Sequence, residues 1–584
     1  MLSALAVRSS EYHATPYAGD DVFADTWVAV DGAGRAAPGF QKCGPRRNDK
    51  FVGIFYWTWH TPERGGPYDN SKLLTRTNHQ AIQWPPSSDH HWGEPELGYY
   101  LSTDPFVIRK HASMLTDAGV DVIFFDTTNP PQTWKPQYEA LCREYTAMRK
   151  EGARTPAFAF IAPFGDPTPV TDRLWRDLYL PGLWKDLWLV WESKPLLLAN
   201  PAFIKDEAMR QFFTFRQPMP DYWVGPNGPN QWSWLEVYPQ HAFTNAIGRT
   251  EQVSVGVAQN ALPNTPGPAA MSLRAGSMGR SWHNGKKDPR SGAVNLGLNF
   301  EEQWKRAIQL DPQFVFVTGW NEWIARRFTK WSSYDDSQCY EPGGLFVDEY
   351  NQEYSRDCEP MRGGHDDNYY YQLASWIRRY KGVRPSQTAS GPSAIKVDGK
   401  FDDWKNVQPE YRDTIGDVIH RDHPGYGSLH YTNDTGRNDF VIAKTAYDTA
   451  NIYFYIQTLE KITPRTGSNW MLLYIDADQD AKTGWMGYDF LVNLEVPSET
   501  KTTIKSWKQG KWDTTGKLNY RLNGNGMEIE IPRRLIWQNG RSPAFDFHWA
   551  DNIQNLTDIS EFGLNGDSAP NRRWNYRFGV MGEK

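Results

Sequence analysis

The chain has 584 residues and a formal net charge of −6. This length predicts more than one domain, and the charge gives no global basic field, so we expect no nucleic-acid partner. No run of 18 apolar residues occurs, so no transmembrane segment is predicted. The 27 Trp, 29 Tyr and 28 Phe are unusual. Aromatic faces line ligand sites and stack on sugar rings, so this bias favours a glycan-handling protein over one with only a large aromatic core.

Residues 1–49 are predicted to be an N-terminal extension. Their start, "MLSALAVRSSEYHATPYAGDD", has a short apolar piece without a charged segment before it. It is either the remnant of an export signal or an artificial start. We expect a secreted, periplasmic or cell-surface protein.

Residues 50–383 are predicted to alternate strands with helices. The segment 104–120 has apolar residues at helical spacing and Gly119 as a C-cap, and 299–311 is a second helix. This alternation predicts a (β/α)8 TIM-like barrel, with a doubly wound open sheet as the alternative. The lack of G-x-G-x-x-G after the first strand counts against the alternative. The predicted strands are 50–59, 121–129, 155–164, 194–200, 221–225, 232–240, 251–261 and 314–323.

Composition changes near residue 382. The stretch 384–393 is rich in Pro, Ser and Gly and is predicted to be a linker between independently folded units. Residues 394–584 contain short alternating runs such as "NIYFYIQTL" and "GMEIEIP", which predict an all-β sandwich. Cys339 and Cys358 flank one polar segment and are either paired or free thiols.

Three carboxylates are candidates for catalysis because barrel enzymes place catalytic groups at the C-terminal ends of strands. Glu322, in "TGWNEWIARRF", lies between tryptophans that would desolvate it and raise its pKa, as suits a general acid. Glu236 is the expected partner and Asp126 the reserve. The structural alternatives are a cap for Asp126, a hydroxyl or arginine contact for Glu236, and a pair with Arg326 or Arg327 for Glu322.

Aromatic, amide and imidazole side chains at the same strand ends predict a sugar-binding cleft, since amides bond to hydroxyls and tryptophans stack on sugar faces. No zinc-protease, P-loop or serine-hydrolase motif occurs, so no cofactor is expected for catalysis. The predicted substrate-binding residues are Tyr56, Trp57, Trp59, His60, Trp92, Asn129, Gln240, His241, Gln259, His283, Asn284, Trp320, Asn321 and Trp323.

The segments 99–129, 194–200 and 318–323 resemble barrel glycosidases related to glycoside hydrolase families 71 and 99. This resemblance implies hydrolysis of α-linked glucans or mannans. Those families carry a second carboxylate three residues after the acid that Glu322 matches, and this chain has Ala325 there. The second carboxylate must therefore come from elsewhere, with Glu236 and Asp126 as candidates.

The C-terminal part has the pattern D-x-D-x-D at Asp476, Asp478 and Asp480. Oxygen ligands at this spacing begin calcium loops and predict Ca²⁺, with a solvated acidic turn as the alternative. The segments 394–404 and 474–493 resemble family 9 carbohydrate-binding modules, which implies sugar binding through aromatics such as Trp470, Trp485 or Trp507, or a packing domain that has lost it.

The sequence thus predicts a glycoside hydrolase acting on a poly- or oligosaccharide. The alternatives are a non-catalytic glycan-binding protein, in which Ala325 reflects lost chemistry, and a polysaccharide lyase that holds a uronate with Arg326 or Arg327.

Overall fold

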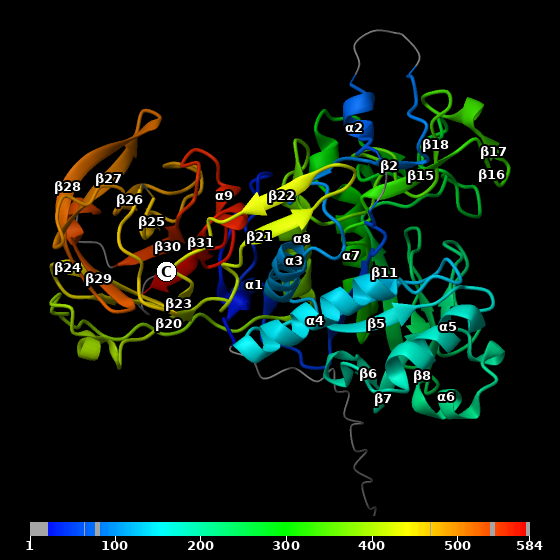
Figure 1. Cartoon of the computed structure of the whole chain (residues 1–584), viewed down its shortest axis with the longest axis horizontal. Helices are drawn as coiled ribbons and strands as arrows, with labels where there is room; N and C mark the ends of the chain where they lie inside the picture. The colour runs from blue at the N-terminus through cyan, green and yellow to red at the C-terminus, as the bar shows by residue number, and fades with distance from the viewer. Residues whose placement is uncertain (1–20, 63–64, 76–81, 468, 538–542, 580–584) are drawn as a thin grey trace, which may run out of the picture.

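A computed structural model describes residues 21–62, 65–75, 82–467, 469–537 and 543–579. Two large sheets lie at opposite ends of the molecule, the barrel at one end and the C-terminal sheet at the other (Figure 1). Within the described residues, no helix has the length and apolarity that a membrane crossing needs.

Eight parallel strands form a nearly closed barrel, which confirms the predicted β/α barrel. Short β10 (Phe243–Thr244) pairs antiparallel with one end strand of this sheet, and short β6 (Val190–Trp191) pairs antiparallel with the strand Lys194–Leu198. The two ends of the sheet come together to close the barrel: the backbone N–H of Ser233, in the strand at one end, donates to Oε1 of Gln252, in the parallel strand at the other end, at 3.0 Å. The parallel strands are β1 (Phe51–Tyr56), β4 (Val122–Asp126), β5 (Ala157–Ile161), β7 (Lys194–Leu198), β8 (Thr214–Met219), β9 (Gln231–Ser233), β11 (Thr250–Gly256) and β14 (Phe314–Thr318).

The fifth and sixth strands differ from the prediction. The fifth is β8 rather than 221–225, where Asp221 instead accepts from the backbone N–H groups of Trp223 and Val224 and forms a turn. Strand β8 was missed because its inward Arg216 is polar; Arg216 is buried against Glu251 at 2.6 Å. The sixth, β9, ends at Ser233, so the predicted strand 232–240 is mostly loop.

Helices surround the barrel as predicted. The helix expected at 104–120 is α3 (Pro105–Ala118), with Asp104 as N-cap and Gly119 at φ 90° as C-cap. The helix expected at 299–311 is α7 (Leu298–Leu310). The others are α4 (Lys135–Glu151), α5 (Thr168–Leu174), α6 (Glu207–Phe212) and α8 (Asn368–Lys381).

Short helices and strands lie outside the eight barrel strands, chiefly in the long loops. They are α1 (Phe40–Cys43), α2 (Asn70–Leu73), β2 (Asp89–His91), β3 (Glu94–Pro95), β12 (Trp282–His283), β13 (Lys286–Lys287), β15 (Ile324–Phe328), β16 (Lys330–Trp331), β17 (Tyr334–Asp335), β18 (Leu345–Phe346) and β19 (Met361–Arg362). Strand β15 pairs with both β2 and β18, and so fixes the loop that follows the last barrel strand.

The C-terminal sheet is antiparallel and curls into a barrel-like sandwich. Alternating side chains of its strands fill the interior, as the sequence runs predicted. A short helix, α9 (Glu561–Leu564), covers one end. The strands are β20 (Glu410–Arg412), β23 (Phe440–Tyr447), β24 (Asn451–Thr458), β25 (Leu472–Asp476), β26 (Phe490–Val492), β27 (Lys501–Lys508), β28 (Lys511–Asn523), β29 (Gly526–Pro532), β30 (Ala544–Asp551), β31 (Asp567–Ala569) and β32 (Tyr576–Gly579).

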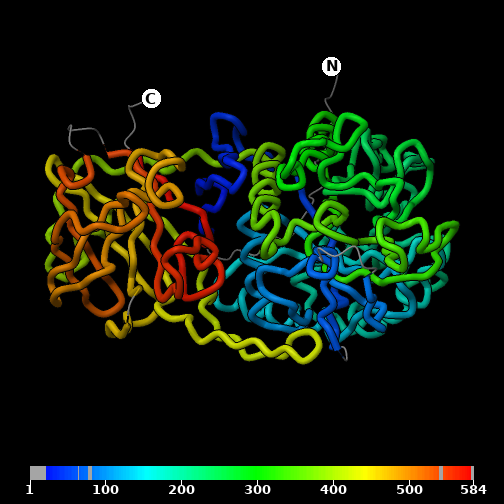
Figure 2. The backbone as a smooth tube through the Cα atoms, turned by 90° about the horizontal axis from the view of Figure 1, so that it is seen from above, coloured from blue at the N-terminus to red at the C-terminus, as the bar shows by residue number. Residues whose placement is uncertain are grey.

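A hairpin, β21 (Arg421–Pro424) and β22 (His430–Asn433), extends from the C-terminal sheet toward the barrel (Figure 2). Arg421 in this hairpin pairs with Asp104, the N-cap of α3, at 2.7 Å, and both side chains are buried. The C-terminal segment adds a second buried pair, Arg572 with Glu96 at 2.7 Å. The interface between the two sheets therefore carries buried charges that each part supplies to the other.

The predicted linker 384–393 holds no helix or strand. It is nevertheless anchored, because Arg384 pairs with Asp21 at 2.6 Å and also with Asp25, both from the N-terminal extension. The backbone N–H of Ser393 donates to the carbonyl of Tyr447 in β23 at 2.8 Å. The N-terminal extension thus packs where the two sheets meet.

Candidate functional site

A cleft of about 360 Å³ opens at the C-terminal ends of the barrel strands. Residues that follow β1, β4, β5 and β14 contribute its walls, as expected for a barrel enzyme. The lining residues are Phe55, Trp57, Trp59, Thr61, Asp89, Asp126, Thr128, Asn129, Trp134, Phe164, Trp234, Glu322, Ile324, Ala325, Arg326, Phe328, Asp348, Arg356 and Tyr426.

One wall of the cleft is a row of three tryptophans. The rings of Trp57 and Trp59 are 4.2 Å apart, and those of Trp59 and Trp134 are 5.0 Å apart. Their three indole N–H groups are buried and have no hydrogen-bond partner among the described residues. Such a row offers aromatic faces on which a sugar ring can stack.

Glu322 lies in the cleft and is only 3% exposed. Its carboxylate accepts a hydrogen bond from Arg356 at 2.8 Å, and its backbone N–H donates to Asp357 at 2.8 Å. Burial raises the pKa of Glu322 well above its ordinary value; Arg356 opposes this shift, while the charges of Asp348 and Asp357 add to it.

Neither arginine proposed as the structural partner of Glu322 takes that role. Arg326 pairs with Asp89 at 3.4 Å, and Arg327 donates to the carbonyls of Pro85 and Gly343 at 3.0 and 3.2 Å. Strand β15 directs both side chains away from Glu322 because it pairs with β2 and β18 immediately after the Glu322 position.

Asp126 is the last residue of β4 and also lines the cleft. One carboxylate oxygen accepts from the backbone N–H and the hydroxyl of Thr128, at 3.0 and 2.8 Å, so the predicted capping role does apply to that oxygen. The other oxygen, Oδ2, is buried without a partner among the described residues. Burial raises the pKa of Asp126 to about 6, although the two Thr128 bonds lower it.

Glu236 is not among the cleft-lining residues, so the expected pairing of Glu236 with Glu322 across the cleft does not match the structure. Because β9 ends at Ser233, Glu236 lies in the following loop, fully buried. Its carboxylate accepts from the backbone N–H of His241 at 2.9 Å and contacts the imidazole of His241 at 2.8 Å. Burial raises the pKa of Glu236 to about 8.

Among the charged residues that line the cleft, Asp348 and Arg356 were not predicted, nor was Asp89 of β2. Arg356 is fully buried and contacts Glu322, Glu349 (3.3 Å) and Asn260 (3.0 Å) as well as Asp348 (3.6 Å). Asp348 is half-exposed at the cleft. Asp348 and Arg356 lie in the long loop between β18 and β19. This loop does not follow a barrel strand, so the strand-end rule could not predict them. The dense acidic run "VDEYNQEYSRDCE" was the signal available there.

The predicted substrate-binding residues fall into three groups. Trp57, Trp59 and Asn129 line the cleft. Asn321 lies beneath it and exchanges two hydrogen bonds with the backbone of Trp57, at 2.8 and 3.1 Å, so it positions that tryptophan. The remaining ten do not line the cleft and are Tyr56, His60, Trp92, Gln240, His241, Gln259, His283, Asn284, Trp320 and Trp323.

Most of these ten residues pack against or hydrogen-bond to other residues of the protein interior. Trp92 stacks on Trp323 at 4.4 Å, and Gln259 bonds to Asn299 at 3.0 Å, all in the interior. The strand-end rule predicted too many cleft residues, because large side chains near strand ends can also pack into the barrel core. Which way each side chain points depends on the loop that follows. His283 and Asn284 lie on the β12–β13 hairpin, with His283 bonded to Asp288 at 3.0 Å.

The C-terminal part contributes one residue to the cleft. Tyr426, in the turn of the β21–β22 hairpin, lines it. The Tyr426 backbone N–H donates to the carbonyl of Tyr99 at 2.7 Å, and its ring packs edge-on against His91 at 4.9 Å. The hairpin therefore completes one side of the cleft.

The predicted sugar-binding tryptophans of the C-terminal part are mostly core residues. Trp470 and Trp485 are buried, and Trp507 is partly buried against Trp512 at 5.0 Å. Four described cysteines, Cys339 and Cys358 among them, are free thiols.

The predicted calcium loop has a different set of acids from the one expected. Carboxylate oxygens of Asp476, Asp478 and Asp489 lie within 4.8 Å of one another. Asp480 is not in this group; its side chain accepts from the backbone N–H of Lys482 at 3.1 Å. Asp489 was not predicted because it lies outside the D-x-D-x-D pattern. The chain turns after Gly484, and Asp489 comes back beside β25 just before β26 pairs with it.

No family model and no curated protein sequence matches the chain. Among solved structures, two of the GH99 endo-alpha-mannosidase from Bacteroides thetaiotaomicron are similar to it. One, in complex with BIS-TRIS-propane, is 18% identical, covers 57% of this chain and 98% of that chain, and has a TM-score of 0.32. The other is 16% identical, covers 58% and 99%, and has a TM-score of 0.33.

Proposed function

We propose that the protein is a glycoside hydrolase and that Glu322 and Asp126 are its two catalytic carboxyl groups. The observation that carries this proposal is that both side chains line one cleft together with the row Trp57, Trp59 and Trp134. Glycosidases cleave with two carboxyl groups that flank the scissile bond. The aromatic row supplies the platform on which a sugar would be held.

The two carboxyl groups differ in environment, and this difference assigns their roles. Burial raises the pKa of Glu322 well above its ordinary value, which favours Glu322 as the general acid that donates a proton to the leaving oxygen. Asp126, with a pKa of about 6, is largely ionised at neutral pH. Its unpartnered oxygen is available to act as the base or nucleophile.

Other residues of the cleft would support this chemistry. Arg356 orients Glu322 through its 2.8 Å contact and leaves the second Glu322 oxygen free to carry the proton. Asp348, 3.6 Å from Arg356, is the alternative partner carboxylate. Ala325 lines the cleft at the position where the glycosidases that the sequence resembles carry an acid, so the second carboxylate is assigned to Asp126, with Asp348 as the alternative.

A product screen tests the proposal. The full chain is incubated with plant, algal and host glycans, and the products are examined for new reducing ends and for ultraviolet absorbance. Reducing ends without absorbance support hydrolysis. Absorbance from a new double bond would indicate a lyase, and retention of glycan without any product would indicate a binding protein.

We also propose calcium binding by the loop with Asp476, Asp478 and Asp489, in which Asp489 replaces the predicted Asp480. Three acids at this separation suit an oxygen-binding cation. Calcium titration calorimetry on wild type and Asp478→Asn tests it. If the two proteins bind the same number of ions, the loop is a solvated acidic turn.

A further inference from the structure

Four carboxylates lie together inside the C-terminal part, next to the barrel. Asp413 and Asp417 precede the β21–β22 hairpin, Asp439 precedes β23, and Asp567 begins β31. None of the four residues is more than 8% exposed. Carboxylate oxygens of Asp417, Asp439 and Asp567 lie within 4.8 Å of one another. We call these four residues the interior acid cluster.

Several oxygens of the interior acid cluster have no hydrogen-bond partner among the described residues. They are both oxygens of Asp413 and Oδ1 of Asp417 and of Asp439. The other oxygen of Asp439 accepts from the backbone N–H of Gly416 at 2.8 Å, and Asp567 accepts from that of Phe440 at 2.6 Å. Backbone donors thus hold the cluster in shape but leave four buried acceptors unsatisfied, which is costly unless a cation or protons satisfy them.

Nearby basic side chains do not neutralise the cluster. Arg109 is committed to Glu144 and Glu151, at 2.9 and 2.5 Å. Lys110 acts on Asp417 and Asp439 only at longer range, with no ion pair within 4.0 Å to the cluster in the part of the chain that the structure describes. Burial and the charge of Asp417 raise the pKa of Asp439 to about 7.

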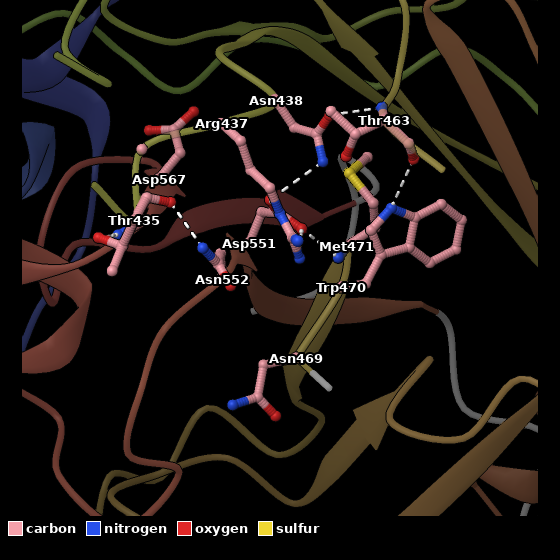
Figure 3. A network of polar contacts seen from close by, with 12 residues as sticks. Thr435, Arg437, Asn438, Thr463, Asn469, Trp470, Met471, Asp551, Asn552 and Asp567 are labelled. Atoms are coloured by element: carbon pink, nitrogen blue, oxygen red, sulfur yellow. Dashed lines mark hydrogen bonds and ion pairs between the residues drawn. The ribbon is translucent and has the colours of Figure 1, made fainter. Parts of the chain in front are cut away.

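A neighbouring acid shows the contrasting case. Asp551 is also buried, but it pairs with Arg437 at 2.7 Å and accepts from Asn438 at 3.0 Å, as Figure 3 shows. The same figure places Asp567 beside this network. One acid of this region is therefore neutralised by an arginine, while the interior acid cluster has no such partner.

We propose that Asp417, Asp439 and Asp567 bind a divalent cation of the calcium type, with Asp413 beside them in the same cluster. The cluster offers only carboxylate oxygens, which suit a hard cation rather than zinc or copper. Two oxygens on opposite sides of Ca²⁺, each at about 2.4 Å, are about 4.8 Å apart. Calcium tolerates irregular and bidentate coordination, whereas magnesium keeps several waters, for which a buried site leaves little room.

The position of the cluster gives the cation a structural role. Asn571 bonds to Asp117 at the end of α3 and to Thr414 in the cluster segment, both at 3.0 Å. The segment 413–417 leads directly into the hairpin that carries Tyr426 to the cleft. A bound cation would therefore fasten this segment between the C-terminal sheet and the barrel.

Calcium-dependent stability of the full chain tests the proposal. Because the oxygens are covered, metal is removed by unfolding and refolding in EGTA, and melting is then recorded with Ca²⁺, with Mg²⁺ or with EGTA. We expect Ca²⁺ to raise the melting temperature and Mg²⁺ to do so less. Asp417→Asn and Asp439→Asn should bind Ca²⁺ at least about tenfold more weakly and lose most of the increment, since ligand charge sets calcium affinity.

Matched variants separate this cluster from other causes. Asparagine removes charge repulsion, so Asp417→Asn should fold at least as stably as wild type in EGTA. Asp551→Asn should lower the melting temperature but keep the calcium increment, and Asp478→Asn should affect only the loop site. The proposal fails if Ca²⁺ does not stabilise the wild type, if Asp417→Asn and Asp439→Asn keep the full increment, or if Asp478→Asn alone abolishes it.

Discussion

The guanidinium of Arg356 donates to the carboxylate of Glu322 at 2.8 Å, and both side chains are almost completely buried at the wall of one cleft. The two residues lie on different loops, after β14 and between β18 and β19. Their contact fixes the direction of Glu322 and leaves one of its oxygens for the proton. The same arginine lies 3.6 Å from Asp348, so it links two cleft carboxylates.

Glu322→Gln should lower kcat by about 10² to 10⁴ while substrate binding persists, because glutamine keeps the shape but supplies no proton. The measurement is steady-state kinetics together with calorimetric binding. Glu236→Gln is the matched control: it removes a buried carboxyl group of the same barrel that does not line the cleft. Normal turnover by Glu322→Gln would remove Glu322 from the mechanism.

The acid limb of the pH–rate profile should report Asp126. A base must be ionised, so kcat/KM should rise with pH through about 6, the raised pKa of Asp126. Thr128→Val removes the hydroxyl bond that lowers this pKa and keeps the backbone bond. The limb should therefore move to higher pH in Thr128→Val. An unmoved limb would assign it to another group, with Asp348→Asn as the next variant to measure.

Glu236 should give a stability signal rather than a rate signal. Its folded pKa of about 8 lies above the ordinary value of 4.5, so the folded protein holds a proton that the unfolded chain has released. This group's contribution to stability therefore falls as pH rises from about 5 to 8, by up to about 1.4 kcal/mol per pH unit. Glu236→Gln mimics the protonated form and should flatten that slope in denaturant titrations. An unchanged slope would show that Glu236 is ionised in the fold.

Trp59→Ala should weaken substrate binding about threefold to tenfold, which corresponds to about 0.7–1.4 kcal/mol, because Trp59 lies between the other two tryptophans of the row. Binding to the best glycan of the product screen is the measurement. Trp376→Ala, on the outer helix α8, is the control for loss of a half-buried tryptophan. Equal losses in the two variants would contradict a specific role for the row.

The fragment 1–385 should aggregate or lose its activity, which replaces the expectation of an independently soluble barrel. Removing the C-terminal part takes Arg421 and Arg572 away from Asp104 and Glu96 and exposes the apolar barrel surface that it covers, such as Tyr371, which packs on Trp574. Expression of the fragment and of full-length Tyr426→Ala measures the two effects separately. A soluble, active fragment would restore the view of two independent units.

The sequence by itself determined the elements that local periodicity encodes. Apolar runs alternating with the patterns of α3 and α7 predicted the barrel, and alternating runs after residue 393 predicted the C-terminal sheet. Asp126, Glu322, Trp57 and Trp59 were correctly placed at the cleft, because strand ends converge on one face of a barrel whatever the loops do. Strand β8 escaped prediction because its buried Arg216 is neutralised by a residue 35 positions away.

Only the tertiary structure decided what the loops and the C-terminal part bring to the same place. Arg356 and Asp348 reach the cleft from a long loop, and Tyr426, 300 residues after Asp126 in the sequence (426 − 126), reaches it from a hairpin. Glu236 is turned toward His241 because β9 stops at Ser233, three residues before it. The interior acid cluster likewise joins residues from 413 to 567. Periodicity reports a residue's immediate neighbours, whereas these contacts depend on chain paths that only packing fixes.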